Sequence, residues 1–352
     1  MATPTATYQV YQGGGTKGVG LGNREDLEDA FYMISPTATP FLTMCSRTKA
    51  TATYHEWLTD TLNATGNNAQ IEGDDATAVG NNNITSLPPV RYGNMIQNSA
   101  KTAIVSDNQE AVTSAGKINK MANQVAKRMA EIKLDMEYAL TRNNSASAGS
   151  ATTAAQLGSL EGWLWGSGTA APTGGSGATL AAATTGNSIN IGTAEGTTPS
   201  FTSGLSAATT TASSNNAVYV AALKAVIKNC WQSGGDPQII MCGGSQKQTI
   251  SGFAGIATIY REAGKTSAGT AIIGAADLYV SDFGEHRVIP NRSQRGSSVF
   301  VLDMDFWSVA YLRSISQKEI ARTGSAQKRF IDVAYTLVAR NPASSGKIMG
   351  CT

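Results

Sequence analysis

The chain has 352 residues, of which 41% are hydrophobic and only 15% charged, and its formal net charge is +2. The charged fraction lies below the ~25% that is typical of soluble domains, which predicts either low solubility or a surface that partners largely cover. A net charge this close to zero argues against strong binding of nucleic acid by a single copy.

The first residues, MATPTATYQV, contain neither the basic segment nor the apolar core of a signal peptide. No apolar run approaches the ~20 residues that a membrane-spanning helix needs. We therefore expect a protein that is made in a cytoplasm and has no contact with membranes. None of the four cysteines lies in a CxxC pair, so reduced thiols are expected rather than metal ligands: Cys45, Cys230, Cys242 and Cys351.

Residues 1–22 are rich in Thr and Gly and predict an extended arm, and a short helix is expected before Pro36. From Thr51 the sequence alternates like a β-strand with two semi-polar faces, and a second strand is expected from Val90 to about Asp107. Together these strands predict one long two-stranded ribbon. Because an isolated hairpin is only marginally stable in water, the ribbon is expected to lie on a surface outside its own chain's core.

The segment between the two strands, residues 63–86, is rich in Gly and Asn and carries three acids at Glu72, Asp74 and Asp75. The spacing of an EF-hand calcium loop is missing. Two interpretations stay open, namely a solvated loop and a loop tip that meets a basic patch on a neighbour.

The strongest periodic pattern lies in residues 109–142, where apolar residues recur every three or four positions: Ile118, Ala122, Val125, Met129, Ile132, Met136 and Leu140. This pattern predicts one amphipathic helix on the order of 50 Å long, capped by Ser106 or Asp107. A coiled coil is the weaker alternative because a seam of Ala and Met specifies one poorly. Ion pairs along the polar face are expected at Arg128–Glu131 and Lys133–Glu137.

Residues 143–216 consist mainly of Ala, Gly, Ser and Thr, and Glu161 and Glu195 are their only charged residues. A flexible linker is the simplest interpretation of such a composition. The stretch LEGWLWG at residues 160–166 argues against it, because its two Trp and two Leu favour burial. We therefore expect a β-rich, loop-rich insertion.

From residue 217 the pattern changes to α/β, with a helix expected at 218–231 and short strands after it. A closing hairpin is predicted over residues 316–340, with its turn at Gly324. One face of its last strand is entirely apolar and is expected to be buried: Ile331, Val333, Tyr335, Leu337 and Ala339.

Motifs that carry chemistry are weak. Residues 13–18 match the literal string G-x-G-x-x-G, but no strand precedes them and no ribose-binding acid follows about 20 residues later. Cys242 follows an expected strand and precedes two glycines, so a hydrolase that uses Cys242 and His286 is kept as an alternative from another class. Apart from that alternative, we expect no catalytic residue, no metal site and no cofactor.

The order of arm, ribbon, long helix, insertion, α/β unit and closing hairpin resembles the major capsid proteins of tailed phages with the Hong Kong 97-like fold. The resemblance covers most of the chain outside residues ~167–215 and rests on order and length rather than on a catalytic signature. The similar stretches are REDLEDAFYMISPTATPFLTM (24–44), ATATYHEWLTDTL (50–62), LEGWLWG (160–166), CWQSGGDPQIIMCGGSQKQTISGF (230–253), DLYVSDFGEHRVIPNR (277–292) and IARTGSAQKRFIDVAYTLVARNP (320–342).

The resemblance implies an α+β capsid fold whose parts can be assigned along the chain. These parts are an N-terminal arm at 1–46, an extended β-hairpin loop at 47–108, the spine helix of a peripheral domain at 109–142, an insertion at 143–216, an axial domain at 217–312, and C-terminal strands that complete the peripheral domain at 313–352.

The resemblance also implies a non-enzymatic virion subunit that self-assembles into pentamers and hexamers and encloses double-stranded DNA in an icosahedral shell. Its expected partners are further copies of the chain, the packaged DNA, and scaffolding, portal and decoration proteins. In such a shell the ribbon lies across the adjacent subunit, and the expected contact residues are Phe41, Tyr54, Trp57, Tyr92, Asp74 and Asp75. A tail-tube or decoration protein stays open as an alternative within the structural class.

Overall fold

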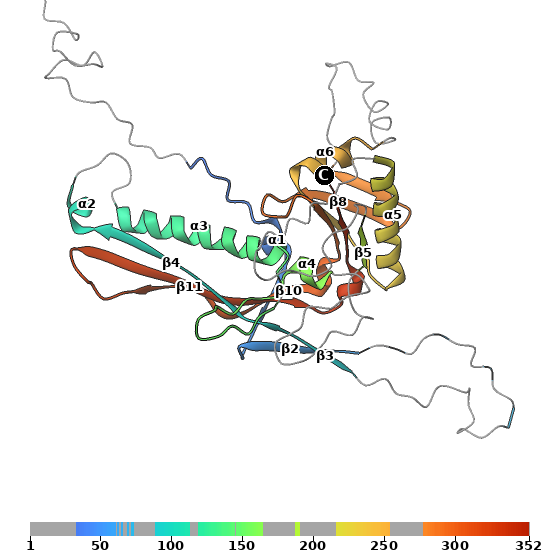
Figure 1. Ribbon diagram of the computed structural model, residues 1–352, viewed down its shortest axis with the longest axis horizontal. Coiled ribbons are helices and arrows are strands. Elements are labelled where there is room, and N and C mark those ends of the chain that lie inside the picture. Colours follow the sequence, from blue (N-terminus) through green and yellow to red (C-terminus); the bar gives the residue numbers. More distant parts are fainter. Residues whose placement is uncertain are drawn as a thin grey trace, which may run out of the picture.

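Two packed units make up the part of the chain that the computed structural model describes (Figure 1). An elongated sheet carries a long helix along one face, and a second sheet is flanked by two further helices. The described residues are 33–60, 89–112, 119–144, 146–164, 187–190, 216–253 and 277–351, together with positions 62, 65, 69, 72 and 73.

The elongated sheet has four strands in the order β1-β10-β11-β4. Their bounds are β1 Ser46–Lys49, β4 Gln97–Ser106, β10 Trp307–Glu319 and β11 Ala326–Ala339. Strands β10 and β11 form the predicted closing hairpin, and Gly324 in its turn has φ +122°, a conformation that side chains rarely adopt. Strand β1 adds to β10 in parallel, and β4 adds to β11 in antiparallel register.

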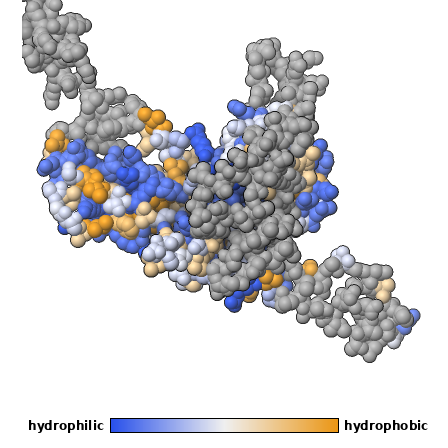
Figure 2. Space-filling view, viewed as in Figure 1, coloured by the Kyte–Doolittle hydropathy of each residue, from blue (hydrophilic) through white to orange (hydrophobic). Residues whose placement is uncertain are grey.

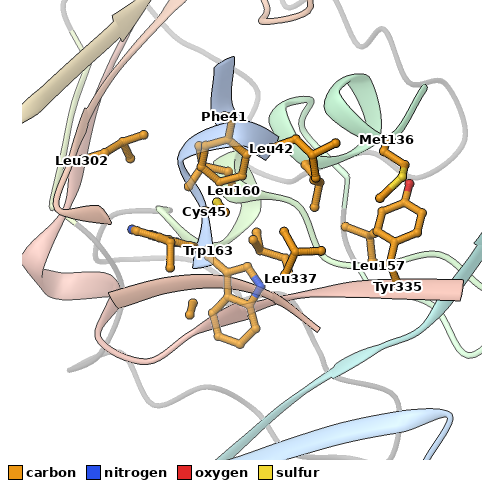
Figure 3. Packing of buried hydrophobic residues seen from close by; sticks show 14 of the residues in the cluster. Phe41, Leu42, Cys45, Met136, Leu157, Leu160, Trp163, Leu302, Tyr335 and Leu337 are labelled. Carbon is orange, nitrogen blue, oxygen red and sulfur yellow. The ribbon is translucent and has the colours of Figure 1, made fainter. Parts of the chain in front are cut away.

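Helix α3 (Lys120–Thr141) covers one face of this sheet. The apolar face predicted for the last hairpin strand is buried there, and Ile331, Val333, Tyr335 and Leu337 are fully inaccessible to solvent. They pack with α3 residues of the same cluster, including Met136 (Figure 3). Burial of this apolar area supplies the main driving force for joining the hairpin to the helix.

The single helix expected over residues 109–142 is wrong at its N-terminal end. A short helix α2 (Asp107–Ala111) ends before Val112, whose backbone is extended, and α3 begins only at Lys120. Each helix has its own cap, because the Ser106 hydroxyl accepts from the Gln109 N–H and the Asn119 side chain accepts from the Ala122 N–H. The sequence VTSAG at 112–116 has low helix propensity, which favours this division.

The second sheet has six strands in the order β5-β12-β9-β6-β8-β7. Their bounds are β5 Asn187–Asn190, β6 Ile239–Cys242, β7 Leu278–Ser281, β8 Gly284–Pro290, β9 Ser298–Leu302 and β12 Gly346–Met349. Helices α5 (Asn216–Gln232) and α6 (Gly244–Ser251) pack on the face that carries Ile240, Val299 and Val301. The other face, with Met241, Phe300 and Leu302, joins the core of the elongated sheet.

Strand β12 corrects the expectation that residues 313–352 complete only the first unit. It pairs with β9 antiparallel and with β5 in parallel, so the last strand of the chain lies inside the six-stranded sheet. All four of its residues are buried. The short 3₁₀ helix Pro342–Ser344 separates it from β11, and a second one, Met304–Phe306, precedes β10.

The core between the two units is filled by two short helices, α1 (Pro40–Met44) and α4 (Leu160–Trp163). Phe41 and Leu160 are fully buried there (Figure 3). Helix α4 comes from the stretch LEGWLWG, so burial of that stretch up to residue 164 is confirmed. Strand β5 also comes from the predicted insertion, whose remaining residues 165–186 and 191–215 lie outside the described part of the chain.

The predicted ribbon is much shorter than expected. Strand β2 (Tyr54–Thr59) pairs antiparallel with β3 (Val90–Met95), and these two strands form a separate two-stranded sheet. The second expected strand turns at Ile96, which is buried against Ala310, Ala334 and Val338, and then continues as β4 in the elongated sheet. Residues 97–106 are therefore sheltered by their own chain, which corrects the ribbon predicted over residues 51–107.

Asp332 on β11 is a buried carboxylate that accepts hydrogen bonds from Ser316 Oγ and Lys318 Nζ, each at 3.0 Å. Arg313 lies 3.1 Å from the same group. Burial alone would raise the pKa of Asp332, but the hydrogen bonds from Lys318 and Ser316 and the charges of Lys318 and Arg313 outweigh it and lower the pKa. A group with a lowered pKa stabilises the fold above its unfolded value of 3.8, and this contribution disappears as the pH falls through the folded value.

We therefore expect Asp332→Asn to lower the free energy of unfolding by about 1 kcal/mol at pH 7. This deficit shrinks as the pH falls below 3.8, where the wild-type carboxyl also becomes neutral. Urea denaturation of the unassembled chain at pH 7 and pH 3 measures both values. An equal deficit at the two pH values would show that the ionised carboxylate contributes nothing to stability.

Candidate functional site

The two-stranded ribbon is anchored to its own chain at its base. Trp57 on β2 donates from Nε1 to the Ala339 carbonyl at 3.0 Å, and its ring lies 5.6 Å from that of Trp163 on α4. Tyr92, opposite Trp57 in the register, is only 4% exposed and belongs to the main core. One face of the ribbon therefore packs on the chain that carries it.

Asn94 fixes the position of β3. Its side chain is fully buried and donates to the carbonyls of Gly158 at 2.9 Å and Leu337 at 2.8 Å, while its Oδ1 accepts from the Gly158 N–H at 2.8 Å. Thr336 on β11 donates from Oγ1 to the Met95 carbonyl at 2.7 Å. These bonds satisfy buried polar groups, so the angle at which the ribbon leaves the body is well defined.

The other face of the ribbon points away from the body. Tyr54 lies over Gly93 of the paired strand, and a Cβ at Gly93 would come within 2.6 Å of the Tyr54 ring. A glycine is therefore needed for this close approach. Glu56 and Arg91 form an exposed ion pair at 3.7 Å on the same face, and such pairs contribute little to stability.

The outer end of the ribbon exposes apolar side chains. Leu58 is 66% exposed, Leu62 96% and Val90 43%. Figure 2 shows hydrophobic side chains in orange close to β2 and β3, next to the grey residues. Exposed apolar groups that gather on a projecting element mark a surface that another molecule covers.

A pocket of about 340 Å³ lies on the opposite side of the elongated sheet, between α1, β1, α3 and β10. Apolar groups in its lining are Leu42 and Ile315, and two cations, Arg47 and Lys133, stand at its wall. The full lining is Thr39, Leu42, Thr43, Arg47, Lys133, Tyr311, Ser314 and Ile315. The pocket can therefore take a chain segment that carries both apolar atoms and negative charge.

The structure separates the contact residues expected from the sequence into three groups. Phe41 and Tyr92 are buried in their own core, which corrects the expectation that they meet a neighbour. Trp57 is half-buried and uses its N–H within its own chain, while Tyr54 is half-buried on the outward face. Asp74 and Asp75 lie outside the described residues.

The exposed apolar residues of the ribbon end differ from the contact residues expected from the sequence, and they are Leu58, Leu62 and Val90. Leu58 and Leu62 share one face of the predicted strand with the acids Glu56 and Asp60. The outward face of a solvated strand is normally polar. Leucines that alternate with acids on such a face are therefore the sequence signal that could have identified Leu58 and Leu62 as contact residues.

The geometry does not support the Cys242 and His286 alternative. Cys242 is fully buried, and burial raises the pKa of its thiol to about 11. His286 lies on β8 four residues before Pro290, the register partner of Cys242, so roughly 13 Å of strand separates the two positions. The His286 ring instead donates from Nδ1 to the Pro237 carbonyl at 2.5 Å and lies 2.7 Å from Ser281 Oγ.

The described residues contain neither a cluster of metal ligands nor a membrane-spanning helix. No three His, Cys, Asp or Glu side chains in that part of the chain are grouped so that they could hold a metal ion. Of the helices that the structure describes, none is both long and apolar enough to cross a membrane.

Comparisons with known proteins agree on one class. A model of the SU10 major capsid protein family matches residues 4–352. A protein named "Major capsid protein" from Escherichia phage Phieco32 is 30% identical over 120 residues, which are 34% of this chain and 33% of that protein. The aligned stretch thus spans about a third of the length of this relative.

Solved structures give the fold over almost the whole chain. The capsid protein of a native GTA particle has a TM-score of 0.57 and 12% identity, with 96% of this chain and 98% of that chain covered. The mature capsid protein of bacteriophage PhiM1 has a TM-score of 0.57 and 8% identity, with 99% and 98% covered. This likeness confirms the predicted α+β, Hong Kong 97-like fold.

Proposed function

Because the chain belongs to the SU10 major capsid protein family, we propose that copies of it form pentamers and hexamers that close an icosahedral shell around the double-stranded DNA of a tailed phage. The observation that carries the proposal is the family match over residues 4–352. This match also favours a capsid shell over the tail-tube and decoration alternatives.

The ribbon supplies the physical support for self-association. Its base is held rigidly by Asn94 and Trp57, whereas its outer end exposes Leu58, Leu62 and Val90. A rigid base lets the apolar end bind a neighbour with little loss of conformational freedom. Weak contacts of this kind, repeated over a closed shell, add up to a stable particle.

The proposal includes the role of each part of the chain. The arm, insertion and axial domain keep the ranges expected from the sequence. The spine helix is α3, the extended loop consists of β2, β3 and the residues between them, and β1, β4 and β12 belong to the sheets in which they pair. The subunit acts as a non-enzymatic building block of the virion. Scaffolding, portal and decoration proteins and the enclosed DNA are its proposed further partners.

Replacing the exposed Leu58 by aspartate is expected to impair assembly while leaving the subunit folded. The side chain is 66% exposed, so its loss costs the isolated fold little. A buried leucine contributes about 1.5–3 kcal/mol, so the critical concentration for assembly should rise at least about tenfold. Sedimentation velocity and negative-stain microscopy over a concentration series measure the yield of particles.

The matched control is Leu58→Ile, which keeps the apolar contact and should assemble like the wild-type chain. The thermal midpoint of unassembled Leu58→Asp should equal that of the wild-type chain. A wild-type chain that stays monomeric at high concentration would contradict the proposed function, and a Leu58→Asp variant that assembles normally would exclude Leu58 from the contact.

A further inference from the structure

We propose that the pocket between α1, β1, α3 and β10 receives the acidic segment 72–75 of a second copy of the chain. This inference rests on the proposed shell function and names the contact that the ribbon of one copy makes on the next. It concerns the segment between the two ribbon strands, which carries Glu72, Asp74 and Asp75 within four positions.

The chemistry of the pocket fits a short acidic segment. Arg47 and Lys133 place two positive charges at its wall, and neither forms an ion pair with another residue that the structure describes. Hydroxyl groups of Thr39 and Ser314 line the same space and can donate to carboxylate oxygens, whereas the Thr43 hydroxyl already donates to the Thr39 carbonyl at 2.6 Å. A volume of about 340 Å³ suits a few side chains.

The segment has the reach to arrive there from a neighbour. Residues 61–88 connect Asp60, which follows β2, to Pro89, which precedes β3. About half of this length, fully extended, spans roughly 45 Å beyond the end of the ribbon. The acids lie near its middle, at the point that can extend farthest from the body.

The geometry favours a second copy over the same copy. The end of β3 meets the sheet on the face of Ala334 and Thr336, where Ile96 packs and Met95 accepts a hydrogen bond, whereas the pocket lies on the face that α3 covers. Figure 1 shows β2 and β3 on one side of the β10–β11 hairpin and α1 and α3 on the other. The segment of the same copy would have to reverse its direction around the sheet to reach its own pocket.

The N-terminal arm is the competing occupant because it also carries an acidic run, Glu25, Asp26, Glu28 and Asp29. This run precedes residues 33–38, which are exposed, with Ile34 exposed by 94%. Figure 1 shows the described part of this segment leading away from α1. Residues 33–38 of the same copy therefore lead away from the pocket, and the arm of another copy is an outcome that the test distinguishes.

A charge-swap experiment tests the contact in the full-length chain. Lys133→Glu, combined with Arg47→Glu, is expected to raise the critical concentration for particle assembly about tenfold at low salt, and less at 1 M salt. Asp74→Lys with Asp75→Lys should have a similar effect. The chain that carries all four substitutions should recover most of the wild-type yield, because each reversed charge again meets its opposite.

The matched control is Lys127→Glu, which reverses an exposed charge on the same helix outside the pocket lining and should assemble normally. Equal thermal midpoints of the unassembled variants establish that folding is intact. Normal assembly of the Arg47 and Lys133 variant, or its rescue by Glu28→Lys with Asp29→Lys instead, would overturn the inference and leave the shell function standing. A wild-type chain that forms no particles would overturn both.

Discussion

Replacing Glu161 by leucine will lower the free energy of unfolding of the unassembled subunit by about 3–5 kcal/mol. Glu161 on α4 and Lys347 on β12 are both buried, and their Oε1 and Nζ atoms lie 3.8 Å apart. Arg295 lies 3.5 Å from the same Oε1 atom, and Ser298 donates to it at 2.9 Å. Removal of the carboxylate leaves the buried ammonium of Lys347 without its counter-charge, which is the costly half of a buried ion pair.

A double-mutant cycle separates this effect from a simple loss of packing. Lys347→Met alone should also destabilise, whereas Glu161→Leu with Lys347→Met should recover most of the lost stability, because neither charge then remains buried alone. Glu319→Ala is the matched control, since it breaks an exposed pair with Arg329 at 3.0 Å and should cost less than about 1 kcal/mol. Urea denaturation measures all four chains, and strictly additive losses in the cycle would contradict the coupling.

The second large effect is expected at Glu137, where alanine should cost about 3–5 kcal/mol. The carboxylate is fully buried on α3 and accepts from the Phe41 N–H at 2.9 Å, the Leu42 N–H at 2.8 Å and Asn291 Nδ2 at 2.7 Å. It therefore joins α1, α3 and the loop after β8 at one point. The alanine variant leaves three buried donors without an acceptor, and each unsatisfied donor costs about 1–3 kcal/mol.

Two further variants show whether the loss of stability comes from the buried carboxylate. Glu137→Gln keeps one acceptor oxygen but turns an amide N–H₂ towards a backbone donor, so its loss should fall between those of wild type and Glu137→Ala. Glu131→Ala on the same helix removes a partly exposed partner of Arg128 and should cost under about 1 kcal/mol. Chemical denaturation gives these values. Equal stability of Glu137→Ala and Glu131→Ala would show that the junction does not depend on this carboxylate.

Local patterns predicted the elements whose partners are nearby in the sequence. The closing hairpin was predicted with its turn at Gly324 and its buried face, because strict alternation and a turn glycine are both local signals. The helix at 218–231 is confirmed as α5. The Arg128–Glu131 pair is also confirmed, at 2.6 Å.

The features that the sequence missed depend on distant partners. The spacing of Lys133 and Glu137 predicts an ion pair on the helix surface. In the structure the Glu137 carboxylate is buried instead, because it accepts hydrogen bonds from the backbone N–H groups of Phe41 and Leu42, about 95 positions away. Similarly, the sequence of β4 continues the strand-like pattern of β3 without a break. The two become separate strands in different sheets because the chain turns at Ile96, which is buried against the elongated sheet. No local pattern encodes a partner that is chosen by tertiary packing.

The candidate site was predicted in outline and corrected in detail. The expectation of a projecting ribbon holds for β2 and β3, yet the aromatic residues chosen as anchors mostly serve the ribbon's own base. The side chains left exposed are aliphatic, namely Leu58, Leu62 and Val90. Aromatic rings pack well both in a chain's own core and in contacts between molecules. Residue type alone therefore could not tell the base of the ribbon from its outer end.

A cryo-electron microscopy reconstruction of particles assembled from the purified chain tests the central claim most directly. The account predicts a closed shell of pentamers and hexamers in which the β2–β3 ribbon of each copy crosses an adjacent copy and covers Leu58. Particles in which every ribbon end stays uncovered, or contacts only its own chain, would contradict it.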